Sequence, residues 1–115
     1  MTDEEFDALA RSLPEVTYAD HFGMGAYKVA GKKIFACPSA TRGGQGLVKL
    51  TPEAQEMLCA AEPDVFTPAK GQWGASGGTA MSVAKADEDL ARSVLWMAWR
   101  ATAPRSLVKK YAAEA

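Results

Sequence analysis

A β-hairpin is predicted by the stretch Tyr27-Lys28-Val29-Ala30-Gly31-Lys32-Lys33-Ile34-Phe35-Ala36. Aromatic and β-branched residues favour one strand over about 25–30 and another over about 33–37, and Ala30-Gly31-Lys32 suits the tight turn between them. The turn carries the charge of the stretch, so an anionic partner would dock there. The remaining elements extend from this hairpin in both directions along the chain.

Helix signals are clear at four places. Thr2 and Glu5 have the spacing of a capping box, and Pro14 ends the helix that they begin. Thr51-Pro52-Glu53 begins a second helix, which Glu62-Pro63 stops. A long helix is predicted over 87–101, with a main apolar stripe of Leu90, Val94, Met97 and Ala101, and a last helix follows Pro104.

Three further strands are predicted, over 47–50, 65–67 and 79–83, with Pro68 placing the second of these at a sheet edge. The glycine-rich segments 42–46 and 69–78 are expected to be loose connections. The element order is then α-β-β-β-α-β-β-α-α. Because short links between strands require antiparallel pairing, the sequence predicts an α+β fold with an antiparallel sheet and helices mainly on one face.

Size and composition indicate one globular domain over residues 1–115, with 48% hydrophobic and 23% charged residues. Such a chain can bury a core without a metal or a disulfide. Cys37 and Cys59 are far apart, the first residues are acidic, and no apolar run reaches the roughly 20 residues that span a bilayer. We therefore expect reduced thiols, a cytoplasmic location and no membrane partner.

The charges are unevenly distributed. Net charge is −1, which argues against tight non-specific binding of nucleic acid. However, residues 21–52 and 90–113 contain basic residues and no acid. Sequence alone leaves open whether these two segments share a face.

The order of motifs resembles the MmcQ/YjbR family of small bacterial proteins. The resemblance runs from about Phe6 to Tyr111. The stretches that carry it are Leu13-Pro14-Glu15-Val16, Phe22-Gly23, the hairpin from Ala26 to Ala36, Leu47-Val48-Lys49-Leu50, Glu62-Pro63-Asp64-Val65-Phe66, Trp96 to Arg100, and Ala103 to Val108. It implies a fold similar to that of type III secretion chaperones. It also implies DNA binding, through hairpins that act as paired wings.

Three binding hypotheses follow. In the first, phosphates of DNA are contacted by Lys28, Lys32, Lys33, Arg42 and Lys49. The alternative is that these lysines keep a hairpin solvated and block edge pairing. In the second, a small ligand or anion binds around His21, Tyr27, Trp73 and Arg105, whereas the alternative for His21 is an ordinary loop position.

In the third hypothesis, the helix that carries Trp96 and Trp99 binds a protein partner or a second copy of the chain, unless both tryptophans complete the monomer core. An enzyme is not expected. The adjacent carboxylates Asp87, Glu88 and Asp89 point in different directions, and Ser39 and Ser106 have no evident base. We predict no catalytic residues, no metal site and no cofactor.

Overall fold

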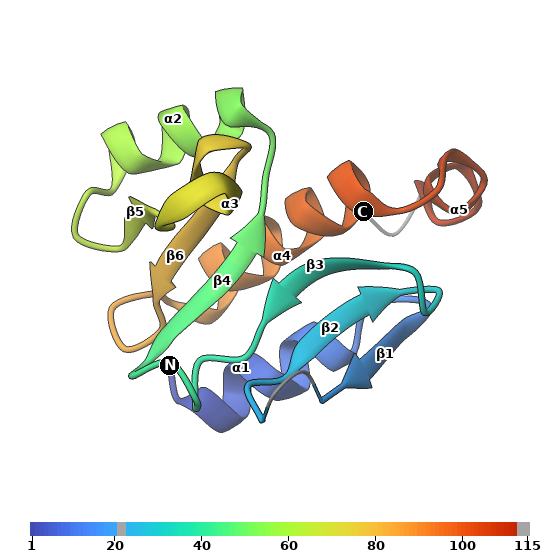
Figure 1. The fold of residues 1–115 in the computed structure, drawn as a ribbon, viewed down its shortest axis with the longest axis horizontal. Helices are drawn as coiled ribbons and strands as arrows, with labels where there is room; N and C mark the ends of the chain where they lie inside the picture. Colours follow the sequence, from blue (N-terminus) through green and yellow to red (C-terminus); the bar gives the residue numbers. More distant parts are fainter. Residues whose placement is uncertain (21–22, 113–115) are drawn as a thin grey trace.

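The computed structural model describes residues 1–20 and 23–112 (Figure 1). In chain order the elements are α1 (Asp3–Arg11), β1 (Val16–Ala19), β2 (Ala26–Val29), β3 (Lys33–Cys37), β4 (Gln45–Lys49), α2 (Pro52–Ala61), β5 (Phe66–Pro68), α3 (Gly71–Ala75), β6 (Gly78–Ser82), α4 (Glu88–Thr102) and α5 (Arg105–Lys110). The predicted helix starts are confirmed: Thr2 and Glu5 form a complete capping box, and the Thr51 and Asp87 side chains cap α2 and α4.

The strands form one antiparallel sheet in the order β1-β2-β3-β4-β6-β5. The α+β fold class is therefore confirmed, and Pro68 does lie in an edge strand. Two elements were not predicted. The segment after Pro14 adds β1 to the far edge, pairing Tyr18 with Tyr27, and the glycine-rich segment expected to be loose contains α3.

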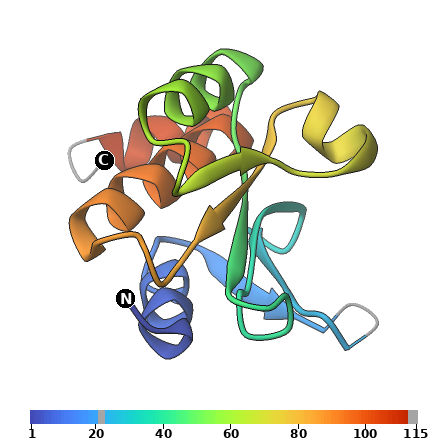
Figure 2. The same ribbon diagram turned by 90° about the vertical axis from the view of Figure 1, so that its left-hand side faces the viewer.

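The helices cover the two faces of the sheet unequally. In Figure 2 the sheet lies close to edge-on, with α1 and α4 on one side and α3 on the other. The face toward α1 and α4, the helix-covered face, contributes Tyr27, Phe35, Val48 and Met81 to the core, all fully buried. Alternate residues of the same strands point to the opposite face, which we call the open face.

The buried stripe of α4 differs from the predicted one. Of the predicted residues only Val94 is fully buried, whereas Met97 is half-buried and Ala101 is exposed. The stripe that packs on the sheet consists of Ala91, Val94, Leu95, Ala98 and Trp99. Small residues at 91 and 98 let α4 approach β3 and β4 closely, so α4 presents the side that carries these alanines to the sheet.

The turn between β2 and β3 has the geometry that right-twisted hairpins prefer. Ala30 and Gly31 have φ angles of 53° and 67°, and the Lys32 amide donates to the Val29 carbonyl at 3.0 Å. Two successive residues with positive φ define a type I′ turn. The turn projects Lys32 and Lys33 from the end of the hairpin.

Candidate functional site

The hairpin tip places two exposed lysines against the junction of α4 and α5. Lys32 and Lys33 line a hollow of about 380 Å³ together with Val29 and residues 101–104. Figure 1 shows the β2–β3 turn and α5 at the same end of the molecule. We call Lys32, Lys33 and residues 100–105 the hairpin end.

The two acid-free basic segments therefore meet at this end. Arg100 and Arg105 flank the junction and are exposed. Glu15 lies beside the turn: its carbonyl accepts from the Ala30 amide at 2.7 Å, and its carboxylate accepts from the Tyr111 hydroxyl at 3.1 Å. The sequence alone could not show that the two basic segments meet, because their contact depends on how α4 crosses the sheet.

The other three predicted phosphate contacts lie elsewhere. Lys28 is half-buried on the open face, paired with Ile34. Lys49, also on the open face, donates from Nζ to the carbonyl and hydroxyl oxygens of Ser76 at 2.6 and 2.7 Å. Only Lys32 and Lys33 of the predicted set are thus at the hairpin tip.

Arg42 has a structural role. It lies in the β3–β4 connection, at the end of the strands opposite the β2–β3 turn. Its guanidinium donates to the carbonyls of Met24, Pro38 and Gly25 at 2.7, 2.9 and 3.2 Å. These bonds tie two loops together and use much of the hydrogen-bonding capacity of the guanidinium.

The described members of the predicted small-ligand set, Tyr27, Trp73 and Arg105, are not brought together. His21 lies outside the described residues. Tyr27 is fully buried on the helix-covered face, and Trp73 lies on the open face. Arg105 begins α5 at the hairpin end. The separation follows from side-chain alternation in β2, which directs Tyr27 away from the face that α3 covers.

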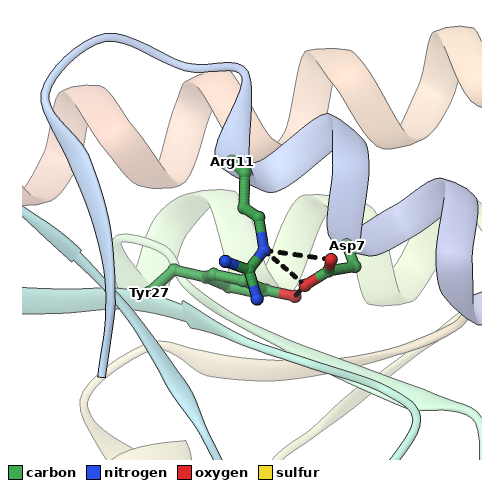
Figure 3. A network of polar contacts seen from close by, with 3 residues as sticks. All are labelled: Asp7, Arg11 and Tyr27. Atoms are coloured by element: carbon green, nitrogen blue, oxygen red, sulfur yellow. Dashed lines mark hydrogen bonds and ion pairs between the residues drawn. The ribbon is translucent and has the colours of Figure 1, made fainter. Parts of the chain in front are cut away.

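Tyr27 belongs instead to a polar network that fastens α1 to the sheet (Figure 3). Its hydroxyl donates to Asp7 Oδ1 at 2.6 Å, and Arg11 Nε donates to both oxygens of that carboxylate at 3.0 Å. Arg11 also lies over the ring of Tyr18, 4.3 Å from its centroid. Burial and then the bond to Asp7 raise the pKa of Tyr27 well above its ordinary value of 10.0, so the phenol is a hydrogen-bond donor and not a general base.

A groove on the open face was not predicted. Its volume is about 630 Å³, and it is lined by Ile34, Cys37, Gln45, Leu47, Thr67, Pro68, Ala69, Lys70, Trp73 and Ala80. We call it the open-face groove. The sequence carried no clear pattern for it, because each strand supplies only one or two of the lining residues and α3, which forms one wall, was expected to be loop.

The tryptophans of α4, Trp96 and Trp99, offer little surface for a partner. Trp99 is fully buried, and its Nε1 donates to the Pro14 carbonyl at 2.8 Å. Its ring packs edge-on against Trp96 and Tyr111, with centroids 5.4 and 6.0 Å away. Trp96 is half-buried by these contacts. The alternative, that the tryptophans complete the monomer core, therefore holds fully for Trp99. It holds only in part for Trp96, which is half-buried.

Reactive groups are few in the described part of the chain. Among residues 1–20 and 23–112, no group of three or more His, Cys, Asp or Glu side chains is placed to hold a metal ion. Burial raises the pKa of the Cys37 and Cys59 thiols above their ordinary value of 9.0, which disfavours the nucleophilic thiolate. No helix in this part of the chain is long and apolar enough to cross a membrane.

Comparison with known proteins agrees with this architecture. No curated protein matches the chain. The crystal structure of a Deinococcus radiodurans protein with the domain DUF419 superposes with a TM-score of 0.75 over 96% of this chain and 88% of that one, at 15% sequence identity, and so shares its fold. The family model YjbR matches residues 11–101. Because that match spans most of the chain, the protein belongs to the YjbR family.

Proposed function

We propose that this protein is a small non-enzymatic binding protein whose partner is DNA, contacted through its phosphates at the hairpin end. The observation that carries the proposal is the position of Lys32 and Lys33. Both are exposed at a protruding turn, beside a junction that Arg100 and Arg105 flank. Four cations on two chain segments thus lie at one end of a protein whose net charge is −1.

Phosphate contacts of this kind give affinity without reading the base sequence. Each neutralised phosphate releases condensed counterions, so the binding constant falls steeply with salt. The local Glu15 carboxylate opposes binding, although it is held by the Tyr111 hydroxyl. We therefore expect weak, strongly salt-dependent binding of duplex DNA.

The test is a fluorescence anisotropy titration of a labelled duplex over a series of salt concentrations. The double variant Lys32→Gln/Lys33→Gln should reduce the slope of log K against log salt by about 2, since each lysine contributes about one phosphate contact. Lys85→Gln removes one exposed charge from the opposite end of the sheet and should leave the slope unchanged. An unchanged slope in the double variant would contradict the proposal.

A further inference from the structure

The hairpin end makes no use of the open-face groove, whose floor is one row of residues across four strands. The sheet register pairs Thr67 with Ala80, Ala80 with Leu47, and Leu47 with Cys37. Since paired residues of neighbouring strands point to the same face, these side chains lie in line. Ala80 is small, which leaves the floor hollow between Thr67 and Leu47, and Cys37 continues the row beyond Leu47.

The wall of the groove is held rigidly. Trp73, on α3, packs on Gly78, where an added Cβ would collide with its indole ring. Gln55 Nε2 donates to the carbonyls of Gly74 and Gly78 at 2.9 and 2.8 Å, and Lys49 holds Ser76 at the end of the helix. A wall that is already ordered lowers the entropic cost of binding a ligand.

The charge around the groove has one sign. Lys70 lines the groove and is exposed, and Lys49 Nζ lies 5.9 Å from the centroid of the Trp73 ring. None of the lining residues is acidic. Among residues 1–20 and 23–112, no carboxylate lies within ion-pair distance of either ammonium.

We propose that the open-face groove binds a small amphipathic anion, with a flat apolar body along the floor and an acidic group toward Lys70. The volume of about 630 Å³ falls within the range of small-molecule sites. Trp73 supplies an aromatic wall, and Lys70 favours a carboxylate, sulfonate or phosphate over a neutral head, whereas the Lys49 ammonium is bonded to Ser76. This site is separate from the hairpin end and does not depend on DNA binding.

The test uses two fluorescent probes that share one aromatic frame. 8-Anilinonaphthalene-1-sulfonate carries the anionic group, and N-phenyl-1-naphthylamine lacks it. The sulfonate should bind the folded protein saturably at one site, and the neutral amine should bind more weakly. No saturable binding of the sulfonate, or equal binding of the two probes, would overturn the proposal.

Two variants locate the probe. Ala80→Phe fills the floor with a residue that strands favour, and should weaken sulfonate binding at least about tenfold. Thr17→Phe adds the same ring at an exposed position on β1 and should leave binding unchanged. Unchanged binding in Ala80→Phe, in a protein with the circular dichroism of the wild type, would show that the probe lies elsewhere.

Charge reversal tests the lysine. Lys70→Glu should weaken the sulfonate about fivefold and leave the neutral amine unaffected, whereas Lys85→Glu should change neither. Equal sulfonate binding by Lys70→Glu and the wild type would overturn the anion preference.

Light scattering tests whether a second copy of the chain occupies the groove. A dimer that excludes the probe, and that Ala80→Phe converts to a monomer, would assign the groove to a second copy and contradict the proposal.

Discussion

The indole ring of Trp73 lies directly on Gly78, at a place where any side chain beginning with a Cβ atom would collide with it. This contact fixes α3 against the first residue of β6. It explains why a segment rich in glycine forms an ordered wall of the open-face groove. Glycine here provides space for a close approach and not flexibility.

Gly78→Ala should therefore lower the free energy of unfolding by about 1–3 kcal/mol, because the new methyl group would collide with both the packed ring and the carbonyl oxygen of Trp73. Urea denaturation measures this. The double variant Gly78→Ala/Trp73→Ala is the control: it removes the ring but keeps the Trp73 carbonyl oxygen, 2.7 Å from the added Cβ, so part of the cost of Gly78→Ala should be relieved. If the costs of the two single substitutions simply add in the double variant, the collision is not the cause.

Tyr27→Phe tests the network of Figure 3. The change removes the bond to Asp7 but leaves that carboxylate paired with Arg11, so we expect a loss of about 1–2 kcal/mol in stability near neutral pH. Tyr18→Phe removes a hydroxyl from an exposed ring and should cost little. Equal effects of the two substitutions in urea denaturation would contradict the network's role.

The raised pKa of Tyr27 also predicts a pH dependence. Below the unfolded-state pKa of about 10 the stabilisation by the buried neutral phenol is complete. Above that pH the unfolded chain ionises first, so the stabilisation is lost as pH rises. The stability difference between wild type and Tyr27→Phe should therefore shrink between about pH 9 and pH 11, as urea midpoints at several pH values would show. A difference that grows with pH would be the contrary result.

Arg42 should matter for stability and not for DNA. Arg42→Lys keeps the charge but cannot reach three carbonyls with one ammonium, so the free energy of unfolding should fall by about 1–3 kcal/mol. Anisotropy titrations should give the wild-type affinity for duplex DNA. A variant of wild-type stability with reduced DNA affinity would return Arg42 to the set of phosphate contacts.

Ala30 is an alanine in a left-handed conformation, which costs about 1 kcal/mol for a residue with a Cβ atom. Ala30→Asn creates the Asn-Gly pair that type I′ turns prefer, and should raise stability by about 0.5–1 kcal/mol. Thermal unfolding measures the gain. A lower melting temperature would mean that the turn does not have this geometry in solution.

Features that the sequence predicted correctly depend on neighbouring residues. Local side-chain and backbone preferences explain the correct predictions: the caps at Thr2 and Thr51, the Ala30-Gly31 turn and the edge position of Pro68. The four residues of β1 carry too weak a pattern to be identified alone, and pairing with β2 makes them a strand. Likewise α3 depends on Gln55, which is distant from it in the chain, and on Gly78, which follows it.

The candidate sites show the same limit. The exposed position of Lys32 and Lys33 at the hairpin tip could be predicted, because the residues of a protruding turn point into solvent. That Arg42 binds carbonyls and Lys49 binds Ser76 depends on where loops 23–25 and 71–76 lie, which no local pattern indicates. The α4 stripe was misjudged for a related reason: two alternative apolar stripes exist on that helix, and packing against β3 and β4 selects the one with alanines.

The most direct test of the central claim is anisotropy of a labelled DNA duplex at low and near-physiological salt, with the wild type, Lys32→Glu/Lys33→Glu and the charge control Lys85→Glu. We predict binding by the wild type at low salt that weakens as salt rises, little binding by the double variant, and near-wild-type binding by the control. No binding by the wild type at low salt, or equal binding by the double variant, would contradict a DNA contact at the hairpin end.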